Sequence, residues 1–138
     1  MTVAAQRADR ASAPVRTIMR PGVVAVPGNA SLTQVAQAMV AHGVHAVLVV
    51  DAGAPGPAGW ATSRALIARL LDATPFVPAI DAVTELPTSI LPSAPIADAI
   101  RALGAPGVTH LLVTTGPAAM PQGVVSETDI VRFAAGHG

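Results

Sequence analysis

The apolar residues of this chain form short continuous runs that predict buried strands. Residues 46–50 and residues 111–113 are the two most apolar runs, and neither alternates with polar residues. Runs of this kind are typical of strands that are covered on both faces of a sheet. Shorter segments that also favour strands lie at residues 24–26, at residues 89–91, and directly after Gly59 and Gly123.

Between these strands, apolar residues recur at the spacing of helices that bury one face. The first such segment follows Ser31, which suits an N-cap, and the second follows Pro95, which suits the first position of a helix. Gly43 and Gly107 stand where the left-handed end of each helix is expected. A closing helix follows the last strand of each half. The apolar positions of the four helices are Leu32, Val35, Ala36, Met39 and Val40; Leu66, Ile67, Leu70 and Leu71; Ile96, Ala99, Ile100 and Leu103; and Ile130, Val131 and Phe133.

The chain from Pro14 onward repeats itself at an offset of 64 residues. The shift places Pro14 on Pro78, Gly43 on Gly107, Leu48 on Leu112, Gly59 on Gly123 and Thr62 on Ser126. Each copy has the order β-α-β-β-α, which predicts an α/β (α+β) chain with two repeats, residues 14–77 and 78–138, after a flexible lead-in at residues 1–13. Because the connection between the repeats is short, we expect them to pack as one unit with pseudo-two-fold symmetry.

One segment, residues 123–130, combines the end of a strand with the start of a helix. Ser126 stands at the expected N-cap, and Asp129 lies about one turn later on the same side of the helix. A helix N-terminus attracts anions, and a carboxylate accepts hydrogen bonds from a sugar diol. The segment therefore indicates a candidate site for a phosphorylated sugar. A capping serine with an acidic first turn explains the same residues without any ligand.

The composition narrows the possible functions. Hydrophobic residues make up 51% of the chain and charged residues 12%, so we expect a second copy to cover an apolar face in a homodimer. The eight basic and eight acidic residues balance, and aromatic residues are 2%, which argues against nucleic acid. No apolar run approaches the about 20 residues of a membrane span, and a cytoplasmic location is expected. The absence of cysteine excludes disulfides and thiolate chemistry.

No catalytic constellation and no metal site are predicted. Ser126 has no histidine at a spacing that indicates a nucleophile–base pair, and no second acid accompanies Asp129. His42 suits a helix C-terminus. His45 and His110 occupy matching places in the two repeats and could converge on a phosphate, while a surface or packing role explains each of them equally well.

The repeated unit resembles a tandem pair of CBS (cystathionine β-synthase) domains, also called a Bateman module. The resemblance depends on the hydrophobic strand, the loop and the pattern Gly-hydrophobic-x-Ser/Thr-x-x-Asp, together with lead-ins at residues 16–19 and 80–83. It covers residues 14 to about 135. It implies a regulatory protein rather than an enzyme, one that requires no cofactor, binds AMP, ADP, ATP, S-adenosylmethionine or sometimes NAD between the repeats, and commonly dimerises.

The resemblance also assigns the ligand site to the second copy. Asp129 would accept hydrogen bonds from the ribose hydroxyls, and Ser126 would face the phosphate or the ribose. Of the other family positions, Ser89 and Ile90 would border the adenine, Val108 would form its other wall, and Thr109 and His110 would reach the phosphates, with His45 in the matching place of the first copy.

The first copy departs from the pattern in a way that weakens its own site. Thr62 keeps the hydroxyl, but Ala65 replaces the acid and the bulky Trp60 is expected to crowd the cleft. The favoured hypothesis is a stand-alone regulatory protein that binds one adenine nucleotide per chain and signals to an unidentified protein partner. The scarcity of basic residues favours AMP, or S-adenosylmethionine, over ATP. The alternative is a structural dimerisation module without a ligand.

Overall fold

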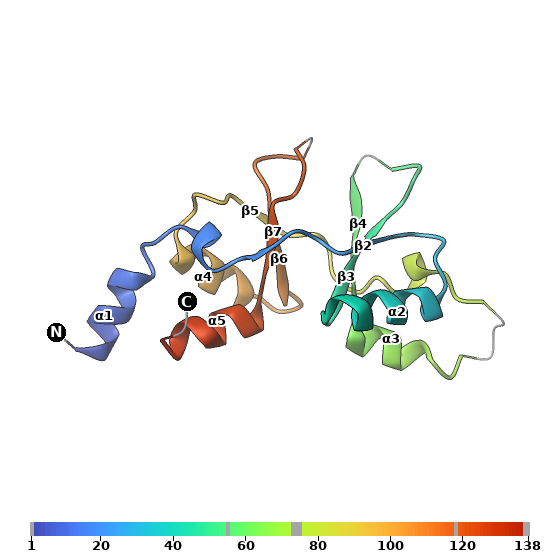
Figure 1. The fold of residues 1–138 in the computed structure, drawn as a ribbon, viewed down its shortest axis with the longest axis horizontal. Helices are drawn as coiled ribbons and strands as arrows, with labels where there is room; N and C mark the ends of the chain where they lie inside the picture. Colours follow the sequence, from blue (N-terminus) through green and yellow to red (C-terminus); the bar gives the residue numbers. More distant parts are fainter. Residues whose placement is uncertain (1, 55, 73–75, 118, 137–138) are drawn as a thin grey trace. The chain divides into compact units, whose positions relative to one another are not determined.

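The chain forms two compact units, each built on a small sheet (Figure 1). The structure, a computed structural model, describes residues 2–54, 56–72, 76–117 and 119–136. Unit 1 comprises Met1–Gly22 and Thr88–Gly138, and unit 2 comprises Val23–Pro87. The mixed α and β architecture confirms the predicted fold class. In the described ranges, no helix has the length and apolar character that a membrane span requires.

Unit 2 contains the strands and helices predicted for the first copy. The strand order is β2-β3-β4, with β2 parallel and β4 antiparallel to the central β3. Helices α2 and α3 lie side by side in this unit (Figure 1). Its elements are β2 (Ala25–Pro27), α2 (Leu32–His42), β3 (Ala46–Val50), β4 (Pro57–Thr62), α3 (Ser63–Arg69) and the 3-10 helix η2 (Ala79–Ala82).

Unit 1 has the same plan with an additional edge strand. Its strand order is β1-β7-β6-β5; β5 runs parallel to β6, and β7 is antiparallel to both β6 and β1. Its elements are α1 (Val3–Arg10), the 3-10 helix η1 (Val15–Thr17), β1 (Arg20–Pro21), β5 (Ser89–Ile90), α4 (Ile96–Leu103), β6 (His110–Val113), β7 (Gly123–Ser126) and α5 (Glu127–Ala134).

The lead-in of each repeat packs with the other repeat's sheet. Strand β1, directly after the first lead-in at residues 16–19, pairs with β7 of unit 1. The second lead-in belongs to unit 2, where Ala79 donates its N–H to the carbonyl of Ala30 at 2.7 Å and Ile80 donates to Gly28 at 3.0 Å. The compact units therefore differ from the predicted repeats in their lead-in segments. Helix α1 also forms where the sequence analysis expects only a flexible lead-in.

The predicted start and end of α2 are confirmed. The N–H of Gln34 donates to Ser31 Oγ at 3.1 Å, and the N–H of Ser31 donates to Gln34 Oε1 at 2.8 Å. This reciprocal pair satisfies two N–H groups that a helix start leaves open. Gly43 follows the helix with φ +61°, the left-handed conformation that glycine adopts without strain.

The boundaries of α4 differ from the prediction. Pro95 is the N-cap rather than the first helical residue, and Gly104 ends the helix in a right-handed conformation. Gly107 does have a positive φ of +77°, but it lies beyond the helix end. The chain thus makes its left-handed turn after α4 has already finished.

Replacing Ser31 by alanine is expected to lower the free energy of unfolding by about 1 kcal/mol, because one N–H of α2 loses its acceptor. The melting temperature should fall by a few degrees. Ser93, an exposed serine in the turn before α4, provides the control. Equal melting temperatures for Ser31→Ala and Ser93→Ala would show that the cap does not stabilise the protein.

The continuous apolar runs are buried, as predicted. The residues of β3 from Ala46 to Val49 are at most 6% exposed, and Leu111, Leu112 and Val113 of β6 are at most 4% exposed. The predicted closing helix of the first copy differs: Leu66 is buried, whereas Ile67 is 66% exposed and Leu71, which lies beyond the last residue of α3, is 96% exposed. An apolar surface on α3 therefore stays uncovered in a single chain.

Candidate functional site

Antiparallel pairing in unit 1 brings the start of β6 beside the end of β7. His110 lies opposite Ser126 in this ladder, and the N–H of Glu127 donates to the carbonyl of Thr109 at 3.3 Å. Ser126 is the N-cap residue of α5, as predicted. Thr109, His110 and Ser126 thus meet at one end of the sheet, beside the N-terminal end of α5, where the helix dipole favours negative charge.

The Asp129 carboxylate is hydrogen-bonded to Ser126, the N-cap residue of α5. Its Oδ2 accepts hydrogen bonds from the Ser126 N–H at 2.8 Å and from Ser126 Oγ at 3.1 Å. Both residues are half-buried. Among the described residues, the second oxygen, Oδ1, accepts no hydrogen bond. These hydrogen bonds are the ones that a simple helix cap requires. They leave the Asp129 Oδ1 atom for a further hydrogen bond at the site.

The side chains of Thr109 and His110 form a hydrogen bond with each other. Thr109 Oγ1 and His110 Nδ1 are 2.8 Å apart, and the direction of the hydrogen bond depends on the histidine tautomer. Both side chains are half-buried. The contact restricts the imidazole ring, so His110 has a defined orientation at the start of β6.

Strand β5 places its two predicted site residues on opposite faces of the sheet. Ser89 is aligned with Leu112, so it shares a face with His110 and Ser126. Ile90 is aligned with Val113 and packs against the core of unit 1. Val108 also packs against that core. The sheet therefore groups Ser89 with the polar residues, and Ile90 and Val108 with the apolar interior.

The first copy contains the same strand-to-helix turn without the acid. Thr62 Oγ1 accepts a hydrogen bond from the N–H of Ala65 at 3.1 Å, so the hydroxyl serves as a cap for α3. Trp60 is 1% exposed in β4. His45 is exposed in unit 2, and its carbonyl accepts from the N–H of Ser63 at 2.7 Å. Nothing in this turn replaces the carboxylate that Asp129 supplies in unit 1.

The glycine of each motif is required by the neighbouring lead-in, which sequence reasoning missed. A Cβ on Gly123 would lie 2.5 Å from the carbonyl oxygen of Arg20 and 2.8 Å from Met19 Sδ. A Cβ on Gly59 would clash in the same way with the carbonyl oxygen of Glu85. The signal in the sequence is the repeat itself, because both copies keep a glycine at this position and a lead-in before the first strand.

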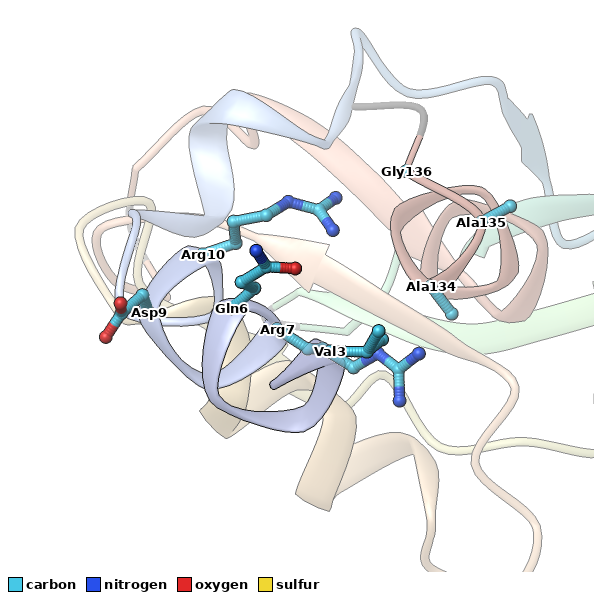
Figure 2. Close-up of a pocket in the computed structure, with 8 residues that line it drawn as sticks. All are labelled: Val3, Gln6, Arg7, Asp9, Arg10, Ala134, Ala135 and Gly136. Carbon is cyan, nitrogen blue, oxygen red and sulfur yellow. The ribbon is translucent and has the colours of Figure 1, made fainter. Parts of the chain in front are cut away.

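A groove in unit 1 separates α1 from the end of α5 (Figure 2). Its volume is about 500 Å³, and its lining residues are Val3, Gln6, Arg7, Asp9, Arg10, Ala134, Ala135 and Gly136. No group of three or more histidine, aspartate or glutamate side chains capable of holding a metal ion occurs in the described part of the chain.

The chain belongs to the CBS-domain family. The family model "CBS domain" matches it twice, at residues 15–72 and 80–136. These two matches correspond to the two copies found in the sequence, and the predicted resemblance is confirmed. A search of the curated proteins finds no match.

Solved structures of CBS proteins share the fold at low sequence identity. The CBS domain of a bacterial CNNM/CorC family Mg²⁺ transporter in complex with ATP is 18% identical with a TM-score of 0.79, covering 99% of this chain and 96% of that chain. A CBS domain protein from Pyrobaculum aerophilum complexed with AMP is 16% identical with a TM-score of 0.72, covering 88% and 98%. A CBS-domain containing protein from Agrobacterium tumefaciens is 21% identical with a TM-score of 0.73, covering 88% and 93%.

Proposed function

We propose that this protein is a regulatory CBS-pair protein that binds one adenine nucleotide per chain at the start of α5. The observation that carries the proposal is the half-buried Asp129 carboxylate, held by Ser126 at a helix N-terminus beside Thr109 and His110. In this arrangement Asp129 accepts hydrogen bonds from the ribose hydroxyls. The N–H groups of α5 and the His110 side chain face the phosphate.

Related structures support a nucleotide as the ligand. A CBS domain of a transporter with the same fold is in complex with ATP, and another CBS protein is in complex with AMP. The chain has only eight basic residues among 138, which favours AMP, with one phosphate, over ATP. S-adenosylmethionine, which carries less negative charge, is the other ligand that we propose to test.

The uncovered apolar surface of α3 supports the proposal that the protein is a homodimer. Ile67 of α3 and the two leucines just after its last residue, Leu70 and Leu71, are 66%, 59% and 96% exposed, and Val40 on the neighbouring α2 is 83% exposed. Monomeric proteins seldom expose several large apolar side chains on adjacent helices. In the proposed role, ligand binding changes the arrangement of the chain or of the dimer, and a protein partner detects the change.

A structural module without a ligand is the second candidate. Ser126 and Asp129 already form hydrogen bonds with each other in the structure, as a simple helix cap requires. The first copy keeps only a capping threonine, Thr62. The Ser126–Asp129 pair by itself is thus compatible with both functions, and a binding measurement separates them.

A thermal-shift screen tests the proposed function. The protein is heated with AMP, ADP, ATP, S-adenosylmethionine or NAD, and GMP serves as the control for phosphate and ribose without adenine. A ligand at a hundred times its dissociation constant adds about 2.7 kcal/mol to the free energy of unfolding, which raises the melting temperature by several degrees. A rise with AMP and none with GMP is expected. Unchanged melting with every adenine ligand would favour the structural module.

A further inference from the structure

We propose that α1 is a latch whose docking on the end of α5 is coupled to the occupancy of the site at the start of α5. This inference depends on the proposed nucleotide site. The latch contacts, the path of the chain after α1 and the length of α5 each support it, and all of these elements lie within unit 1.

Arg10, the last residue of helix α1, makes both a hydrogen bond and a ring contact to Phe133 of α5. Arg10 Nη2 donates a hydrogen bond to the carbonyl of Phe133 at 2.8 Å, and the guanidinium lies 4.6 Å from the centroid of the Phe133 ring. Phe133 is 2% exposed and packs with Ala11 and Ile96. None of the eight residues of α1 is buried. A helix of this length is marginal without tertiary contacts, so docking at Arg10 stabilises it.

The groove between α1 and the end of α5 shows that the two helices are not closely packed along their length. In Figure 2, the side chains of Gln6 and Arg10 extend from α1 toward the turn at Ala134–Gly136, across an open space. That space is about 500 Å³. Helix α1 can therefore separate from α5 without exposing a large packed interface, as a reversible latch requires.

The latch and the proposed site are at the two ends of the same short helix. Asp129 and Phe133 are four residues apart in α5, so they lie on the same face about one turn from each other. The whole helix has eight residues and spans about 12 Å. A ligand that holds Asp129 restrains the first turn of α5, while Arg10 restrains the last.

The chain that follows α1 returns to the proposed site. The carbonyls of Ala11 and Ala13 accept hydrogen bonds from the N–H groups of Ala97 and Ile96, both at 2.9 Å, at the start of α4. Further on, β1 pairs with Gly123 and Val124 of β7, the strand that ends at Ser126. Arg10, the last residue of α1, thus contacts the end of α5, and the segment that follows α1 pairs with the strand that leads into the start of α5.

These contacts determine whether nucleotide binding strengthens or weakens the docking of α1. In this proposal, nucleotide binding and α1 docking each restrain one turn of α5, so each event reduces the conformational entropy that the other must remove. The two events are therefore expected to favour each other. By thermodynamic reciprocity, undocking α1 weakens nucleotide binding by the same factor as nucleotide loss weakens docking. Docked and undocked α1 would then be the two states that a partner distinguishes.

The first test compares Arg10→Ala with Arg7→Ala in calorimetric titrations with AMP. Both variants remove one positive charge from α1, but the hydrogen bond and the ring contact to Phe133 belong to Arg10. We expect Arg10→Ala to weaken AMP binding about fivefold or more, the lower end of common allosteric couplings, and Arg7→Ala to leave it within about twofold. If both variants lose the same amount of AMP affinity, the loss is due to the removed charge alone, and the latch proposal is overturned.

The second test requires no substitution. Hydrogen exchange of the peptide that covers residues 3–13 is measured in the unaltered protein with and without saturating AMP. The latch predicts slower exchange with AMP. Binding of AMP without any change in this peptide overturns the latch and leaves the proposed function intact. If none of AMP, ADP, ATP, S-adenosylmethionine and NAD binds, the proposed function fails and the latch fails with it.

Discussion

Replacing Gly59 by alanine is expected to destabilise unit 2 strongly. Gly59 has φ +150°, a conformation that other residues adopt only with strain. The new Cβ would meet the carbonyl oxygen of Glu85 and would lie 2.7 Å from Val83 Cγ1. Strain and overpacking cost about 1–3 kcal/mol each, a large part of a total stability of about 5–15 kcal/mol.

The clash cannot be relieved locally, because the two segments are hydrogen-bonded to each other. The N–H of Trp60 donates to the carbonyl of Glu85 at 2.9 Å, and the N–H of Thr84 donates to the carbonyl of Trp60 at 3.2 Å. Moving the lead-in away from Gly59 breaks these bonds. The substitution therefore tests whether the second lead-in is part of the fold of unit 2.

The fluorescence of Trp60 allows the unfolding of unit 2 to be measured specifically. Trp60 is the chain's single tryptophan, it is 1% exposed, and it follows Gly59 in β4, so its fluorescence reports unfolding of unit 2. In urea, the midpoint of the fluorescence transition should fall strongly for Gly59→Ala. Gly116→Ala is the control, since a Cβ there meets no atom within 4 Å. Equal midpoints for the two variants would contradict the close approach described for the second lead-in.

Changing Asp129 to asparagine is expected to weaken AMP binding about 100-fold or more. The substitution removes the negative charge that, in the proposed function, would accept hydrogen bonds from the two ribose hydroxyls. Hydrogen bonds to charged groups contribute about 1.5–3 kcal/mol each, and about 1.4 kcal/mol corresponds to a factor of ten in affinity. Asparagine is preferred to alanine because its side-chain oxygen can still accept from Ser126, so the helix cap is retained.

Asp98 offers a matched control for this variant. It is also an acid three residues after the N-cap of a helix in unit 1, but it is exposed and paired with Arg101 at 2.8 Å. Equilibrium dialysis with labelled AMP should give an unchanged dissociation constant for Asp98→Asn. If Asp129→Asn binds AMP as tightly as Asp98→Asn does, Asp129 is a capping residue and the assigned site is wrong.

Local patterns in the sequence were sufficient to predict most of the secondary structure. The apolar runs predicted β3 and β6, and Ser31 with Gly43 marked both ends of α2, because caps depend on residues close in sequence. The hydrogen bonds between Ser126 and Asp129 are also local, three residues apart, and they match the capping explanation that the sequence left open.

Features that depend on distant parts of the chain could not be predicted. Strand β1 has only two residues, one of them a proline, and it exists because β7 offers an edge to pair with. Helix α1 is stabilised by Phe133, which lies 123 residues after Arg10. The placement of Ile90 toward the core follows from its register with Val113, which no local pattern specifies.

The most direct test of the central claim is the stoichiometry of AMP binding to the intact chain, measured by calorimetric titration. The site contains an acid in the second copy, Asp129, whereas the first copy has Ala65 at the matching position. We therefore predict one AMP per chain, with the binding heat lost in Asp129→Asn. Two equivalent sites per chain, or no binding heat at AMP concentrations into the millimolar range, would contradict a single nucleotide site at the start of α5.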